Sequence, residues 1–123
     1  MKISIFGMGY VGAVSLACLS RDGHDVIGVD IDQTKLDLIM AGKTPVVEEG
    51  MVELMARVAA SGKVTVTADA QQAVRDSEIS LVCVGTPSAA NGSQDQGAIL
   101  RLAQEIGRAI AAKQAPHVVV FRS

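Results

Sequence analysis

The sequence has few aromatic residues and little net charge. Its 123 residues include no tryptophan, one tyrosine and two phenylalanines, and its formal net charge is -2. With no basic excess, we expect no nucleic-acid partner and no attraction to anionic lipid. No apolar run approaches the roughly 20 residues of a membrane span, and glycines interrupt the start where a signal peptide needs a continuous apolar core. We therefore expect a cytoplasmic protein with no membrane partner.

Cysteine and histidine are also scarce, with two residues of each. Cys18 falls on the apolar stripe of an expected helix and Cys83 inside an apolar run, so we interpret both as small buried side chains rather than reactive thiols. Cysteines in such places support neither a disulfide framework nor a metal site. His24 and His117 stand alone, and we interpret them as ordinary surface or strand-edge residues.

Apolar runs alternate with helical patterns along the whole chain. Strands are predicted near residues 2–6, 25–30, 64–67, 79–84 and 117–121. Three of these runs are continuously apolar, as expected for parallel strands that are covered on both faces. Right-handed strand–helix–strand units then predict an α/β fold, a doubly wound parallel sheet of Rossmann type with strand order 3-2-1-4-5. We expect one domain over residues 1–123.

The segments between these runs carry apolar side chains at helical spacing. The predicted core stripes are Val11, Val14 and Cys18, then Met51, Leu54, Met55 and Val58, then Ile99, Leu102, Ile106 and Ile110. Gly42 and Gly62 are predicted to end the helices before them. Asp69 and Gln72 have the spacing of a capping box, in which each side chain bonds the other's backbone N–H.

A glycine motif, Gly7-Met8-Gly9-Tyr10-Val11-Gly12, lies between the first predicted strand and the first predicted helix. Gly7 permits a tight turn, Gly9 leaves the backbone open to a diphosphate, and Gly12 lets the helix pack closely. The first N–H groups of a helix have no intrahelical partners and lie at its positive end, so they bind phosphate. This context predicts a dinucleotide site.

Asp30, at the end of the second predicted strand, supplies the acid that this site requires. Its carboxylate would accept hydrogen bonds from the adenosine ribose and would repel a 2′-phosphate, which favours NAD over NADP. The alternative is a plain glycine turn with Asp30 capping a helix that starts at Ile31. That alternative leaves the three glycines unexplained.

A second loop should converge on the same site. The predicted sheet order opens a crevice between strands one and four, and Gly85-Thr86-Pro87-Ser88 follows strand four. Gly85 would let the backbone approach the cofactor, and Thr86 offers a hydroxyl and an N–H. An ordinary strand-terminating turn is the alternative for this segment. Residues 89–97 form either a loop that folds over a ligand or a solvated connector.

The last predicted strand reaches Phe121, and Arg122-Ser123 would be its carboxyl end. Ligands of open α/β sheets bind at that end of the strands. We therefore expect a fragment of a longer protein, truncated after the fifth strand.

Four segments together resemble the UDP-glucose and GDP-mannose dehydrogenase family of nucleotide-sugar 6-dehydrogenases. They are Phe6-Gly-Met-Gly-Tyr-Val-Gly12, Gly28-Val-Asp-Ile-Asp32 with Lys35, Val84-Gly-Thr-Pro87 and Val118-Val-Val-Phe-Arg-Ser123. The resemblance covers all 123 residues. It implies NAD binding by Tyr10, Val11, Asp30, Lys35 and Thr86, with Lys35 near the adenosine end.

The resemblance also implies an activity. Family members oxidise a sugar C6 alcohol to a carboxylate with two NAD, for polysaccharide biosynthesis, and a cysteine holds the covalent intermediate. Neither Cys18 nor Cys83 matches that cysteine's motif, so no catalytic residue is assigned and this chain alone should be inactive. The full-length protein should bind a nucleotide sugar and form a homodimer.

Within the family, residues 85–95 look closer to GDP-mannose 6-dehydrogenase than to the UDP-glucose enzyme. The sequence departs from the family pattern at Glu49, where proline is usual, and at Gln94 and Gln96, where leucine-like residues are usual. Two alternatives share the glycine motif: another hydroxyacid or sugar-phosphate dehydrogenase, and a regulator that senses NAD without chemistry.

Overall fold

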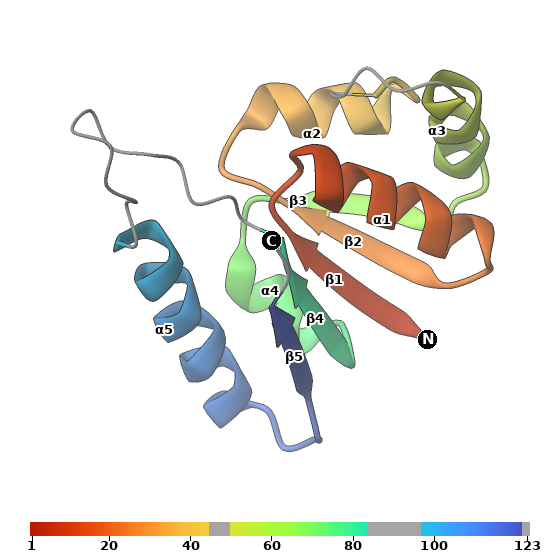
Figure 1. Cartoon of the computed structure of the whole chain (residues 1–123). Coiled ribbons are helices and arrows are strands. Elements are labelled where there is room, and N and C mark those ends of the chain that lie inside the picture. The colour runs from red at the N-terminus through yellow and green to blue at the C-terminus, as the bar shows by residue number, and fades with distance from the viewer. Residues whose placement is uncertain (45–49, 84–96, 122–123) are drawn as a thin grey trace.

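Five parallel strands form one sheet in the order β3-β2-β1-β4-β5, in a computed structural model that describes residues 1–44, 50–83 and 97–121 (Figure 1). The strands are β1 (Lys2–Phe6), β2 (Asp25–Val29), β3 (Val64–Thr67), β4 (Ile79–Val82) and β5 (Val118–Phe121). The predicted fold class and strand order are confirmed. Each strand lies within one or two residues of its predicted range.

The helices are α1 (Tyr10–Arg21), α2 (Gln33–Met40), α3 (Met51–Ala60), α4 (Ala70–Arg75) and α5 (Gly97–Ala112). Two apolar clusters, one on each face of the sheet, show how they are layered. Residues of α1, α2 and α3 pack with Ile3 and Ile5 of β1. Residues of α4 and α5 pack with Phe6, from the opposite face of the same strand. In the described residues no helix has the length and apolar character to cross a membrane.

The buried face of α1 differs from the predicted stripe. Ala13, Leu16 and Ala17 are fully buried, whereas Val11 and Val14 are only partly buried against the core and Cys18 is half-buried. Gly28 of β2 leaves room for this face: a Cβ there would lie 2.9 Å from a methyl carbon of Leu16. The predicted stripe of α3 is confirmed, with Met51, Met55 and Val58 buried. Ile106 is buried in α5, and the side chain of Ile99 lies outside the described residues.

Glycines end the helices as predicted. Gly42 and Gly62 follow α2 and α3 with φ of 77° and 78°, the left-handed conformation that closes a helix. Gly23, with φ of 99°, does the same after α1, which the sequence analysis did not predict.

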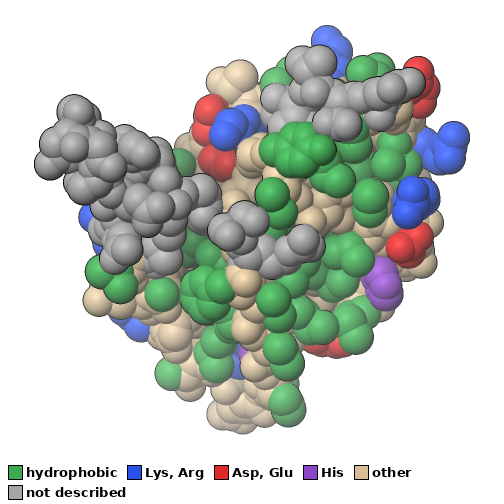
Figure 2. All heavy atoms as spheres, viewed as in Figure 1, with side chains coloured by type: hydrophobic (Ala, Val, Ile, Leu, Met, Phe, Trp, Pro, Cys, Tyr) green, Lys and Arg blue, Asp and Glu red, His purple; other side chains and the backbone are tan. Residues whose placement is uncertain are grey.

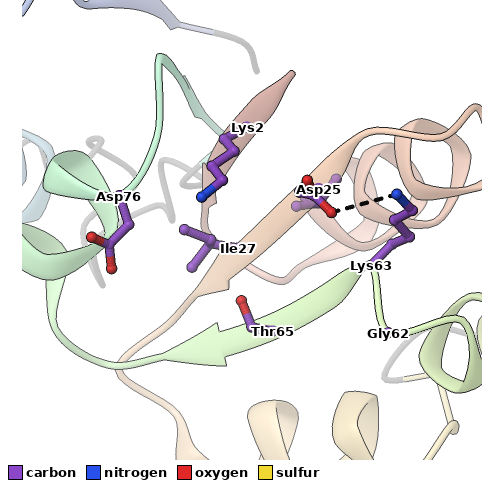
Figure 3. A pocket seen from close by; sticks show the side chains of 8 residues that line it. Lys2, Asp25, Ile27, Gly62, Lys63, Thr65 and Asp76 are labelled. Carbon is purple, nitrogen blue, oxygen red and sulfur yellow. Dashed lines mark ion pairs between the residues drawn. The ribbon is translucent and has the colours of Figure 1, made fainter.

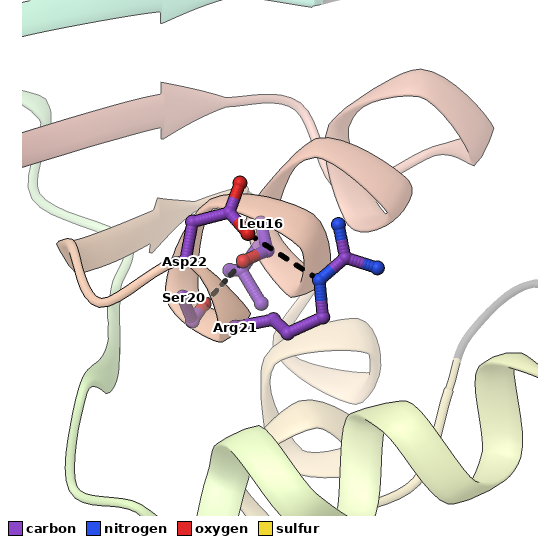
Figure 4. Close-up of polar contacts among 4 residues, drawn as sticks. All are labelled: Leu16, Ser20, Arg21 and Asp22. Carbon is purple, nitrogen blue, oxygen red and sulfur yellow. Dashed lines mark hydrogen bonds and ion pairs between the residues drawn. The ribbon is translucent and has the colours of Figure 1, made fainter.

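In the last turn of α1 the buried Ser20 hydroxyl donates to the Leu16 carbonyl, and Arg21 pairs with Asp22 (Figure 4). The Arg21–Asp22 pair is exposed, so it contributes little stability.

Half of the predicted capping box is present. The Asp69 carboxylate accepts hydrogen bonds from the backbone N–H groups of Gln71 and Gln72, at 3.0 and 3.2 Å, and so caps α4. The reciprocal bond is absent, because the Asp69 N–H donates to the Thr67 hydroxyl at 3.0 Å. The predicted return contact from Gln72 is therefore wrong, and a threonine two residues upstream takes its place.

The fifth strand is less covered than its apolar sequence suggests. In the described part of the chain β5 pairs with β4 and forms an edge of the sheet, with Val118 54% and Phe121 60% exposed. Figure 2, which looks onto the face that carries α1, shows hydrophobic side chains at the surface over β4 and β5. The expectation of a strand covered on both faces is wrong for β5 in this structure.

Three buried serines form a hydrogen-bonded chain on the face covered by α4 and α5. Ser4 of β1 and Ser80 of β4 are paired in register, and their hydroxyl oxygens are 2.7 Å apart. Ser77, in the turn before β4, donates to the Ser4 oxygen at 2.9 Å and also lies 2.7 Å from the Ala73 carbonyl. Each hydroxyl has a partner, so these serines are buried without an unsatisfied polar atom.

His117 extends this chain, contrary to its interpretation as an isolated residue. Its Nε2 lies 2.8 Å from the Ser80 oxygen, and its Nδ1 lies 3.0 Å from the Lys113 ammonium. An ammonium can only donate, so Nδ1 accepts and the ring proton sits on Nε2, from which it is donated to Ser80. Lys113 also donates to the carbonyls of Val74 and Ser77, at 3.1 and 2.5 Å.

This arrangement predicts acid sensitivity. Burial lowers the pKa of His117 because it disfavours the charged ring, and the ammonium of Lys113 lowers it further. A folded-state pKa below the unfolded value means that stability is complete above about pH 6.5 and is lost as the pH falls through the folded pKa. Urea titrations from pH 7.5 to 5 should show this loss of stability. The share of the loss that comes from His117 should be absent in His117→Gln.

His24→Gln is the matched control for this measurement, because it removes the only other histidine. We expect it to leave the pH dependence unchanged. An identical pH profile for His117→Gln and the unmodified chain would contradict the assignment.

Candidate functional site

The carboxyl ends of β1, β2 and β4 border a cavity of about 690 Å³, within the range of small-molecule sites. The backbone bonding of the sheet continues to this edge: the Gly7 N–H donates to the Val29 carbonyl and the Cys83 N–H to the Phe6 carbonyl, both at 2.8 Å. The lining comes from the glycine turn, the end of β2 and the helices α2, α4 and α5. The lining residues are Phe6, Gly7, Met8, Gly9, Val29, Asp30, Ile31, Asp32, Lys35, Ala68, Ala70, Cys83, Arg101, Leu102 and Glu105.

The glycine turn has a distinct requirement at each glycine. Gly7 has φ of 97°, in the left-handed region that favours glycine. A Cβ on Gly12 would lie 1.7 Å from the Gly7 carbonyl oxygen, so the first turn of α1 rests directly on this turn. Among the described residues, a Cβ on Gly9 would meet no atom within 4 Å. The space beside Gly9 is therefore open to a ligand.

Asp30 does not cap a helix. The N-cap of α2 is Asp32, whose carboxylate accepts from the Thr34 N–H at 3.0 Å. Asp30 instead accepts the N–H of Met8 at 2.7 Å on Oδ2 and that of Asp32 at 2.8 Å on Oδ1. The alternative reading of the sequence, in which Asp30 caps a helix from Ile31, is wrong because α2 starts two residues later.

Charged groups of both signs line the cavity. Lys35 comes from α2 and Arg101 from α5, and the carboxylates of Asp30, Asp32 and Glu105 line the same cavity. Within the described ranges neither Lys35 nor Arg101 forms an ion pair.

An apolar part of the lining accompanies these charges. Ile31 is 96% exposed, although large aliphatic side chains are usually buried, and Leu102, Ala68 and Ala70 line the same cavity. The apolar part of the lining could contact a flat apolar base of a ligand. The charged part could contact charged groups and hydroxyls of the same ligand.

The structure brings together four of the residues that the sequence analysis assigned to the site: Gly7, Gly9, Asp30 and Lys35 all line the cavity. The other three described members of the set, Tyr10, Val11 and Gly12, make up the first turn of α1 directly after the glycine turn. Tyr10 is 56% exposed there. Gly85 and Thr86 lie outside the described residues.

Sequence reasoning missed the contribution of α5. Arg101 and Glu105 are four residues apart and line the cavity together with Leu102. Both lie beside the predicted apolar stripe, but that pattern does not specify where α5 packs. Cys83 was predicted to be buried, which is confirmed, but its place in the cavity lining was not predicted.

No group of three metal-binding side chains occurs among the residues that the structure describes.

A second hollow, of about 340 Å³, lies at the other end of the sheet, near the starts of β1, β2 and β3 (Figure 3). Lys2, Lys63, Asp25 and Asp76 line it, and the Lys63 ammonium is 3.8 Å from Asp25. Its charges balance, and it lies away from the carboxyl ends where ligands of such sheets bind. We assign no ligand to it.

Comparison with known proteins identifies the family. All of residues 1–123 match the model described as "UDP-glucose/GDP-mannose dehydrogenase family, NAD binding domain". The chain belongs to this family. Its cofactor is therefore NAD, and the family match decides against the hydroxyacid and sugar-phosphate dehydrogenases as its class.

Relatives within the family differ in their similarity to this chain. GDP-mannose 6-dehydrogenase of Pseudomonas aeruginosa is 52% identical over the whole chain, and UDP-glucose 6-dehydrogenase AglM of Haloferax volcanii is 37% identical. A crystal structure of a ternary complex of the Pseudomonas GDP-mannose dehydrogenase superposes with a TM-score of 0.95 and covers all of this chain. The chain spans 28% of the length of each of these proteins.

Proposed function

We propose that this chain is the cofactor-binding part of a longer nucleotide-sugar 6-dehydrogenase that oxidises the C6 alcohol of GDP-mannose to the uronate with two NAD. The observation that carries the choice of substrate is the identity of 46–52% to six GDP-mannose 6-dehydrogenases, against 37% and 40% to two UDP-glucose 6-dehydrogenases. UDP-glucose is the alternative substrate.

In this proposal the cavity at the glycine turn receives the NAD. The diphosphate lies beside Gly9, where no side chain of the described residues occupies the space, at the positive end of α1. The remaining acceptor positions of Asp30 bind the adenosine ribose, and Lys35 places a cation at the adenosine end. Gly7, Tyr10, Val11 and Gly12 shape this turn, and the proposed NAD contacts include Gly85 and Thr86, which lie outside the described residues.

Bound NAD supplies a hydride acceptor for each of the two oxidation steps. The residues of this chain bind and orient it, and they supply no nucleophile: Cys83 is buried at the cavity wall. We propose that the catalytic cysteine and the sugar-binding residues belong to the part of the relatives that this chain does not span. The proposal includes a homodimer, a cytoplasmic location and a role in polysaccharide biosynthesis.

The cofactor site can be tested with intrinsic fluorescence. The chain has no tryptophan and Tyr10 is its only tyrosine, at the first position of α1. We expect NAD to change the Tyr10 emission saturably, after correction for absorption by the nucleotide, because the diphosphate lies beside this turn. NADP should require a concentration at least about tenfold higher, because the Asp30 carboxylate repels its 2′-phosphate. An equal response to both would contradict the role of Asp30.

The substrate is tested on the full-length protein by following NADH absorbance. We expect turnover with GDP-mannose at a kcat/KM that exceeds the value for UDP-glucose, and no turnover by the 123-residue chain alone. A preference for UDP-glucose would replace the substrate and leave the cofactor site intact. NADH formation by the isolated chain would contradict the assignment of catalysis to residues outside it.

A further inference from the structure

The carboxylate of Asp30 joins two segments that are far apart in the sequence. Oδ2 accepts the backbone N–H of Met8, in the turn between β1 and α1. Oδ1 accepts the N–H of Asp32, in the turn between β2 and α2. Both turns line the cavity, so a single side chain bridges two parts of its wall.

The buried side chain of Met8 holds the glycine turn to the core, but Gly7 and Gly9 on either side of it have no side chains to pack. Glycine loses more conformational freedom on ordering than any other residue, and Gly9 has no side chain to pack. The backbone bond from Gly7 to the Val29 carbonyl holds the start of the turn. The next N–H, that of Met8, is held by Asp30. Hydrogen bonds to a charged acceptor are about twice as strong as neutral ones, so this contact restrains the turn where it matters for a ligand.

The bridge leaves room for the proposed ribose contact. An ionised carboxylate has about four acceptor positions on its two oxygens. One position on each oxygen is taken by a backbone N–H, which leaves the outer positions for hydroxyl groups. Ribose binding and the bridge therefore do not compete.

We infer that Asp30 is a positioning residue for the diphosphate site as well as a ribose ligand: it holds the glycine turn in its binding conformation in the unliganded protein. This inference rests on the proposed function, in which that turn receives the diphosphate of NAD. A ribose ligand alone would not affect the affinity for the diphosphate. The positioning role predicts that this affinity depends on Asp30, although the diphosphate does not touch its side chain.

Amide hydrogen exchange in the unliganded chain tests the bridge directly. Asp30→Ala should accelerate exchange of both the Met8 and the Asp32 amides by about tenfold or more, since each loses a hydrogen bond to a charged group. Asp30→Asn retains a single acceptor oxygen, so exchange of at least one of these two amides should accelerate. This variant keeps the test available if the alanine variant folds poorly. Unchanged exchange at both amides in either variant would overturn the bridge.

Asp32→Asn is the matched control, because it removes the same charge from the same cavity while asparagine still caps α2. We expect it to change Met8 exchange by less than about twofold, as no hydrogen bond to Met8 is lost. Acceleration of Met8 exchange equal to that in Asp30→Asn would show that charge alone is responsible, and would overturn the bridge.

Binding of inorganic pyrophosphate, followed by calorimetry, tests the link to function. Removal of a nearby negative charge by itself strengthens anion binding, as we expect for Asp32→Asn. The bridge predicts the opposite for Asp30→Ala, a loss of about tenfold. Pyrophosphate affinity in Asp30→Ala equal to or above that in Asp32→Asn would overturn the positioning role. Absence of pyrophosphate and NAD binding to the unmodified chain would overturn the proposed site, while the amide data would still decide whether the bridge exists.

Discussion

Gly12→Ala is expected to destabilise the chain by more than about 3 kcal/mol, beyond the usual range for overpacking. The added Cβ would lie 1.7 Å from the Gly7 carbonyl oxygen; its position is fixed by the backbone of Gly12, and its partner is a backbone atom. No side-chain rotation relieves it, so α1 must shift away from the turn or the turn must open. Urea unfolding should show a lower midpoint, and the fall in Tm should be about 10 °C or more.

Gly9→Ala is the control for this prediction, and its expected effects are the reverse. Gly9 has an extended backbone with φ of -77° and ψ of -156°, which alanine adopts, and the new Cβ would meet no atom of the described residues within 4 Å. We expect stability within about 0.5 kcal/mol of the unmodified chain, and loss of the NAD response of Tyr10. Two variants that lost stability equally, or a Gly9→Ala chain that bound NAD normally, would contradict this reading of the turn.

Lys113→Met is expected to cost about 2–4 kcal/mol, although the new side chain has a similar length. The ammonium donates to the carbonyls of Val74 and Ser77, and both residues are buried. Methionine leaves these acceptors without their charged donor at the end of α4. The same change removes a cation 3.0 Å from Nδ1 of His117, so the pKa of His117 should rise. Urea titration measures the first effect, and NMR titration of the ring measures the second.

Lys63→Met is the matched control, since it removes a lysine whose only ion pair among the described residues is an exposed one, with Asp25. Exposed pairs contribute at most about 1 kcal/mol, so stability should change little and the pKa of His117 should not move. A loss of stability in Lys63→Met equal to that in Lys113→Met would contradict a specific role for the Lys113 contacts.

The strand order was predictable because the alternation of apolar runs and helices leaves few right-handed topologies. The buried face of α1 was not. Val11 and Val14 satisfy helical spacing, but the fully buried face of α1, for which Gly28 leaves room, includes the small residues Ala13 and Ala17. Periodicity indicates which side of a helix is apolar, whereas the distance between layers decides which residues on that side fit.

The site was predictable where a local backbone requirement carried the signal. The positive φ of Gly7 and the open space at Gly9 belong to a motif that is readable in six residues. The contributions of Arg101 and Glu105 depend on where α5 docks, which no local pattern specifies. Ser80 likewise becomes a partner of His117 only when β4 and β5 pair, so the residues near His117 in the sequence gave no indication of that contact.

The serine chain between β1 and β4 also bears on how the sheet avoids misalignment. Successive side chains of a strand point to opposite faces, so a slip of one residue between these strands would turn Ser80 into the apolar layer beneath α1. There its hydroxyl would be stranded without Ser4 or His117, and their own polar atoms would lose a partner. Strands of valine, leucine and isoleucine alone can pair in a shifted register with little loss of stability. A few buried hydroxyls make the shifted register much less stable.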